Sequence, residues 1–76
     1  MPTFTNEKDR HNWIVKHANY FTVVRFHGGG VYERYEVPRL ETAKHLAQTL
    51  NLDRLGRPWM IYACTDHMDT FVEAVK

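Results

Sequence analysis

An amphipathic helix followed by a strongly apolar strand is the sequence feature that most constrains the fold. Apolar residues recur at i, i+3, i+4 and i+7, which is the spacing of one helix face: Ala43, Leu46, Ala47 and Leu50. The segment from Pro58 to Cys64 carries apolar residues on both faces, as central strands do. We therefore predict a helix over residues 40–51, closed by Asn51 and Asp53, that packs on one face of a sheet containing this strand.

The segment before this helix has the pattern of a β-hairpin over residues 20–37. Tyr20–His27 is rich in aromatic and β-branched residues, and Val31–Val37 alternates apolar with polar residues. The triplet Gly28–Gly30 between them supplies the positive φ angles of a tight connection. Alternation places Tyr32, Arg34 and Glu36 on one face, which we expect to contact solvent.

Weaker signals mark both ends of the chain. Thr5 or Asn6 can cap a helix over residues 6–17 within an N-terminal segment 1–19, although Trp13–Val15 is also compatible with an extended strand. Residues 66–68 resemble a turn, and Asp69–Val75 resembles a final strand that completes a second hairpin over residues 58–75.

These elements predict one small α+β domain over residues 1–76, in the order α-β-β-α-β-β. If the helical crossover brings the third strand beside the first, the antiparallel four-stranded sheet has the order 2-1-3-4. A domain of this size buries only roughly 60% of the surface that its unfolded chain exposes. The apolar residues must therefore be used efficiently.

Composition indicates a globular protein outside the membrane. Hydrophobic residues make up 43% of the chain, and no apolar run is long enough to span a bilayer. The net charge of +1 offers little long-range attraction for polyanions. A single cysteine excludes an internal disulfide, and the polar start of the chain does not resemble a signal peptide. We expect a cytoplasmic location.

Candidate reactive groups are sparse. Cys64 and His67 have a spacing that zinc accepts, but no second pair of ligands accompanies them. Burial of Cys64 in the apolar strand would keep it a protonated thiol rather than a nucleophile. Asp66 and Asp69 are explained as turn residues that accept bonds from nearby backbone amides. We expect no catalytic residue, no metal and no cofactor.

Two surfaces are candidates for partner binding. One side of the first hairpin would combine cationic and aromatic side chains, as in single-strand nucleic-acid binding: Arg25, His27, Tyr32 and Arg34. The second lies at the corner between helix and strand, where Arg54 and Arg57 lie near the aromatic pair Trp59 and Tyr62, all residue types enriched at binding hot spots. The sequence nevertheless favours Trp59 as a core or rim residue that holds the helix.

The layout also resembles the short accessory proteins of tailed bacteriophages. The resemblance rests on the helix Leu-Glu-Thr-Ala-Lys-His-Leu-Ala at residues 40–47 and on Gly-Arg-Pro-Trp-Met-Ile-Tyr-Ala at residues 56–63. It implies a protein that binds and blocks a host machine, and it transfers no functional residue. Inhibitors that mimic DNA are strongly acidic, and this chain departs from that pattern.

The sequence thus favours a non-enzymatic interaction protein that binds a host protein. A small nucleic-acid-binding module is the alternative. Both a monomer and a homodimer formed through an edge strand or an aromatic surface are compatible with the pattern.

Overall fold

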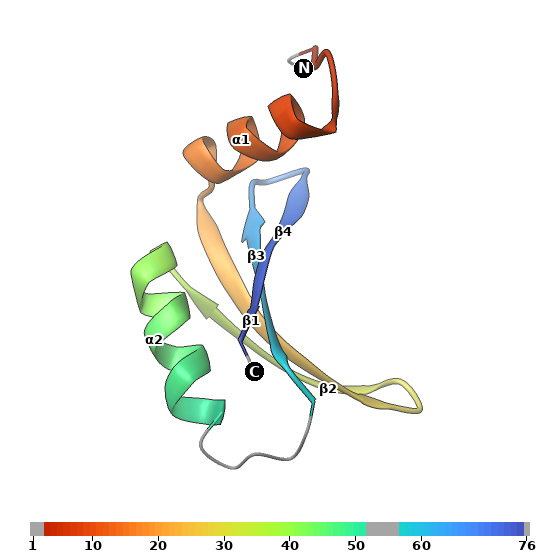
Figure 1. The fold of residues 1–76 in the computed structure, drawn as a ribbon, viewed down its shortest axis with the longest axis vertical. Coiled ribbons are helices and arrows are strands. Elements are labelled where there is room, and N and C mark those ends of the chain that lie inside the picture. The colour runs from red at the N-terminus through yellow and green to blue at the C-terminus, as the bar shows by residue number, and fades with distance from the viewer. Residues whose placement is uncertain (1–2, 52–56, 76) are drawn as a thin grey trace.

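The computed structural model describes residues 3–51 and 57–75, which form two helices and four strands (Figure 1). In chain order these are α1 (Glu7–His17), β1 (Tyr20–Gly28), β2 (Val31–Val37), α2 (Leu40–Leu50), β3 (Trp59–Cys64) and β4 (Asp69–Val75). The predicted α-β-β-α-β-β order is confirmed. No helix among the described residues is long and apolar enough to cross a membrane.

The four strands form one antiparallel sheet in the order β2-β1-β3-β4, as predicted. β1 and β3 are the inner strands, which explains why the segment before Cys64 is apolar on both faces. β1 lies antiparallel to β3, with Phe21 opposite Ala63 and Val23 opposite Ile61. β2 and β4 are the two edge strands.

Both helices pack on the same face of the sheet, and the core lies between these two layers. α2 packs mainly on β1 and β3, while α1 packs on β3 and β4. The buried residues of this layer are Ile14, Phe21, Val23, Ala43, Ala47, Trp59, Ile61 and Ala63. The predicted stripe on α2 faces this core, because Ala43 and Ala47 are fully buried.

Capping fixes the ends of the helices. The side chain of Asn6 accepts a hydrogen bond of 2.9 Å from the backbone N–H of Asp9, so Asn6 is the N-cap of α1. Trp13 and Ile14 lie in the helix, and the extended alternative is excluded. Asn51 closes α2 as predicted, with its backbone N–H directed at the carbonyls of Ala47 and Thr49. Asp53, the other predicted closing residue, lies outside the described residues.

The two hairpin connections differ in chemistry. All three glycines of the first have positive φ, with values of 86°, 59° and 80° for Gly28, Gly29 and Gly30. In the second, Thr65 belongs to the turn and not to β3. Its N–H donates to the carbonyl of Met68 at 2.7 Å, and its hydroxyl accepts from the Met68 N–H at 3.0 Å.

The side-chain acceptor of this second turn is therefore Thr65, and not the aspartate that the sequence suggested. Asp66 instead accepts a hydrogen bond of 2.8 Å from the side-chain amide of Asn19. This contact joins the β3–β4 turn to the segment between α1 and β1. The prediction missed it because the two residues are far apart in the sequence.

Candidate binding surface on the open sheet face

The face of the sheet opposite the helices carries no covering layer among the described residues. Phe21, Val23, Ile61 and Ala63 point into the core, so their strand neighbours point away from it. Residues opposite one another on neighbouring strands share a face. We call this surface the open face. Its side chains are Tyr20, Thr22, Val24, Phe26, Tyr32, Arg34, Glu36, Met60, Tyr62, Cys64, Asp69 and Phe71.

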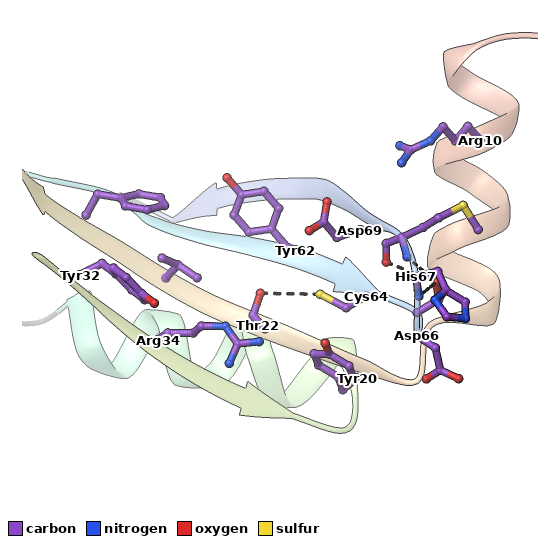
Figure 2. A pocket seen from close by; sticks show the side chains of 14 residues that line it. Arg10, Tyr20, Thr22, Tyr32, Arg34, Tyr62, Cys64, Asp66, His67 and Asp69 are labelled. Atoms are coloured by element: carbon purple, nitrogen blue, oxygen red, sulfur yellow. Dashed lines mark hydrogen bonds between the residues drawn. The ribbon is translucent and has the colours of Figure 1, made fainter. Parts of the chain in front are cut away.

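The open face is hollowed at its centre (Figure 2). The hollow has a volume of about 670 Å³ and is floored by β1 and β3. Residues 65–68 of the β3–β4 turn form one end, where Arg10 of α1 also reaches it. Tyr32 and Arg34 of β2 line its opposite side. The hollow therefore joins side chains from all four strands, one turn and one helix.

Aromatic side chains on this face are exposed to an unusual degree. Phe26 is 45% exposed, Tyr32 56% and Phe71 46%. They are arranged in two pairs: Phe26 and Tyr32 have ring centroids 6.1 Å apart, and Tyr62 and Phe71 are 5.7 Å apart with their rings edge to face. Val24 and Met60, which lie opposite one another, separate the pairs. An exposed apolar stripe of this kind is typical of an interaction surface.

The charges of the open face are balanced. Arg34 donates to the carboxylate of Glu36 at 2.8 Å, and this hydrogen bond raises the pKa of Arg34. Asp66 and Asp69 line the hollow together with Arg10. The face therefore offers aromatic area and local polar contacts rather than a field of one sign.

Cys64 lies at the floor of the hollow. It is 6% exposed, and its sulfur is 3.9 Å from the hydroxyl of Thr22. Burial is the largest of the causes that raise the pKa of this thiol, so it is protonated near neutral pH. His67 also lines the hollow. No cluster of three or more side chains able to hold a metal ion occurs among the described residues.

The structure divides the predicted hairpin surface between two faces. Tyr32 and Arg34 lie on the open face, because they are opposite Phe26 and Val24. Arg25 is opposite Glu33 on the helix-covered face, and His27 contacts the same Glu33 at 3.2 Å. The prediction that these four side chains share one side is wrong. It ignored the alternation of β1, in which Arg25 and His27 follow the core residues Phe21 and Val23.

Arg25 and Trp59 are buried together and offer no surface to a partner. Each is only 1% exposed, and the guanidinium carbon of Arg25 lies 4.5 Å from the centroid of the Trp59 ring. Trp59 is therefore a core residue, which is the interpretation that the sequence favoured. Arg57 is exposed and donates to the carbonyl of Phe26 at 3.1 Å, so it braces the hairpin. Arg54 lies outside the described residues.

Sequence reasoning placed Tyr62 in the second candidate surface, and it lies on the open face. It missed three other aromatic residues of this face, namely Tyr20, Phe26 and Phe71. β1 and β3 are apolar on both faces, so their patterns do not show which face the helices cover. The period-2 spacing of Tyr20, Thr22, Val24 and Phe26 was the available signal. It indicates that these residues share a face without indicating that the face is open.

The fold and this surface define a class: a small two-layer α+β protein in which helices cover one sheet face and the other face is open. Comparison of the chain with protein-family models, with curated proteins and with solved structures finds no match.

Proposed function

We propose that this protein is a non-enzymatic interaction module that binds a partner protein through the open face of its sheet. The observation that carries the proposal is the exposure of Phe26, Tyr32 and Phe71 on a face that no described segment covers. Large aromatic side chains contribute most to binding when a partner desolvates them. The hollow, which Phe26, Tyr32 and Tyr62 help to line, would receive a protruding side chain of the partner.

The backbone around these residues favours tight binding. Their strands are held by antiparallel pairing, with one register shift in the β1–β2 pair and one in the β3–β4 pair. Binding therefore orders side chains but little backbone, which lowers its entropic cost. In the proposed setting, a phage-encoded protein would use this surface in the host cytoplasm to inhibit or modulate a host machine.

Single-stranded nucleic acid is the second candidate partner. The arrangement that favours it is the pair Phe26 and Tyr32 beside Arg34, since aromatic rings stack on bases and arginine contacts phosphate. The ion pair between Arg34 and Glu36 and the balanced charge of the face make this candidate the weaker one. If it is correct, affinity should fall steeply with salt concentration, because phosphate contacts release counterions.

The test is a capture experiment with the tagged protein in a bacterial lysate, with and without nuclease. The decisive variant combines Tyr32→Ala and Phe71→Ala, which removes one exposed ring from each aromatic pair. The matched control combines Glu41→Ala and Gln48→Ala, two exposed positions on α2, the helix behind the sheet. Circular dichroism checks that both variants are folded.

Nuclease-resistant capture of a protein that the open-face variant loses and the α2 variant keeps would support the proposal. Equal capture by both variants would contradict the assignment of the open face. Capture that disappears after nuclease treatment would contradict a protein partner and favour nucleic acid as the partner.

A further inference from the structure

The outer edge of β2 is not paired with any described segment. β2 is the first strand of the sheet order, and its inner edge is occupied by β1. None of its seven residues is buried, and Val31, Tyr32 and Tyr35 are 61%, 56% and 41% exposed. An edge strand of this kind presents backbone N–H and C=O groups that can pair with another strand.

The opposite edge of the sheet is less suited to pairing. β4 is interrupted by a register shift at Ile61 and Tyr62 of its neighbour, and such a bulge bends an edge away from a partner. Its ionisable residues, Asp69 and Glu73, are both acidic. α1 also packs against this strand. Two copies of β4 would therefore repel one another, whereas β2 carries charges of both signs.

The sequence of β2 is complementary to itself. If two copies run antiparallel with Tyr35 opposite Tyr35, Arg34 of each copy faces Glu36 of the other. In the same register Glu33 faces Val37, so no like charges are directly opposed. Within one copy Arg34 and Glu36 already pair at 2.8 Å and remain 40% and 55% exposed. Dimerisation would extend this ion pair into a network of four charges.

We propose that β2 pairs antiparallel with β2 of a second copy of this chain, around a two-fold axis at Tyr35, to form a continuous eight-stranded sheet. The chemistry of recognition is backbone hydrogen bonding, with the Arg34–Glu36 pairs setting the register. α2 packs mainly on the inner strands β1 and β3 and makes fewer contacts with the edge strand β2.

The two-fold axis runs perpendicular to the sheet, so both open faces lie on the same side of the dimer. A partner would meet two hollows on one surface, with the Arg34 and Glu36 side chains between them. The dimer pairs backbone groups along the edge of β2, and the Arg34 and Glu36 side chains that set its register lie on the open face. The dimer does not depend on the proposed function, because its test measures association of this chain alone and needs no partner protein.

Sedimentation velocity over a series of protein concentrations tests the dimer, with charge variants that leave the fold unchanged. Arg34→Glu alone places two carboxylates opposite one another, and Glu36→Arg alone places two guanidinium groups together. Each single variant is expected to weaken dimerisation at least tenfold. The double variant with both changes restores complementary charges and is expected to recover a dissociation constant close to that of the original chain.

A disulfide experiment tests the register. Tyr35→Cys, introduced together with Cys64→Ala, puts two thiols opposite one another at the axis, within reach of a disulfide. Phe71→Cys in the same background is the control, because it lies on β4. Selective oxidation of the Tyr35→Cys variant to a covalent dimer is expected.

Two results would overturn the proposal. The first is a protein that remains monomeric up to millimolar concentration. The second is a dimer whose dissociation constant is the same in both single charge variants as in the original chain. Cross-linking of the Phe71→Cys variant to the same extent as the Tyr35→Cys variant would likewise contradict the proposed register.

Discussion

At the scale of single residues, the burial of the stacked pair Arg25 and Trp59 removes two predicted residues from the candidate binding surface. Both residue types are common at interfaces, which made them candidates from the sequence. In the fold the Trp59 ring lies beneath the guanidinium of Arg25 and 6.0 Å from the ring of Tyr35. The pair therefore joins the ends of β1, β2 and β3 on the helix-covered face.

Trp59→Ala is expected to destabilise the protein by about 3 to 5 kcal/mol, because it leaves a large cavity in the core and removes the ring beneath Arg25. Urea unfolding followed by circular dichroism measures the change. Tyr32→Ala on the exposed face is the control and should change the free energy of unfolding by less than about 0.5 kcal/mol. Similar losses in both variants would contradict the placement of Trp59 in the core.

The buried thiol of Cys64 predicts a specific dependence of stability on pH. Its pKa in the folded protein is raised above the ordinary value of 9.0, so between these two values the unfolded chain releases a proton that the folded chain keeps. The contribution of Cys64 to stability is therefore complete below pH 9 and is lost as the pH rises through its folded pKa.

Urea unfolding of the original chain and of Cys64→Ala over a pH series checks this sign. The difference in the free energy of unfolding between the two proteins should be constant below pH 9. At higher pH, the free energy of unfolding of the original chain should fall relative to that of Cys64→Ala. Parallel pH profiles would show that the thiol has the same pKa in both states.

At the scale of elements, α1 shows how a helix forms from a weak pattern. Ile14 is its fully buried residue, and Trp13 packs between Phe4 and His17 at ring distances of 5.8 and 4.3 Å. Local capping by Asn6 starts the helix, and packing on β3 and β4 holds it in place. A helix with so little apolar surface depends on its cap.

Asn6→Ala should therefore cost about 1 kcal/mol of stability, since it leaves an amide of the first turn without its acceptor. Asn12→Ala, an exposed position inside α1, is the matched control and should be neutral or slightly stabilising because alanine favours helices. Thermal unfolding of both variants measures the difference. An equal loss in the two variants would mean that the cap of Asn6 contributes nothing.

At the scale of the whole molecule, helices cover only one of the two faces of the sheet among the described residues. Two helices cover one face, and Phe26, Tyr32 and Phe71 on the other remain exposed in the single copy. A small domain has little stability to spare, so association is an effective way for it to gain stability.

If β2 pairs between two copies, the midpoint of thermal unfolding should rise with protein concentration, because mass action stabilises the folded dimer. The midpoint of the Arg34→Glu variant should depend less on concentration, because its dimer is weaker. Differential scanning calorimetry at several concentrations measures both. A midpoint that is constant for the original chain would contradict a dimer that is linked to folding.

The order of elements and the boundaries of the helices to within one residue follow from the sequence alone, whereas the sheet order β2-β1-β3-β4 was predicted only on the condition that the crossover brings β3 beside β1. These depend on local signals: the 3.6-residue stripe of Ala43 and Ala47, the cap at Asn6 and the glycines of the first hairpin. The candidate site was only half predicted. Tyr32 and Arg34 were placed on the solvent face because β2 alternates clearly.

Tertiary structure decided which face of β1 and β3 the helices cover, and this choice buried Arg25 and Trp59 and left Phe26 and Phe71 exposed. The physical reason is that the inner strands are apolar on both faces, so alternation groups their residues without showing which group is buried. Only the packing of α1 and α2 onto the face of Phe21, Val23 and Ile61 makes that choice.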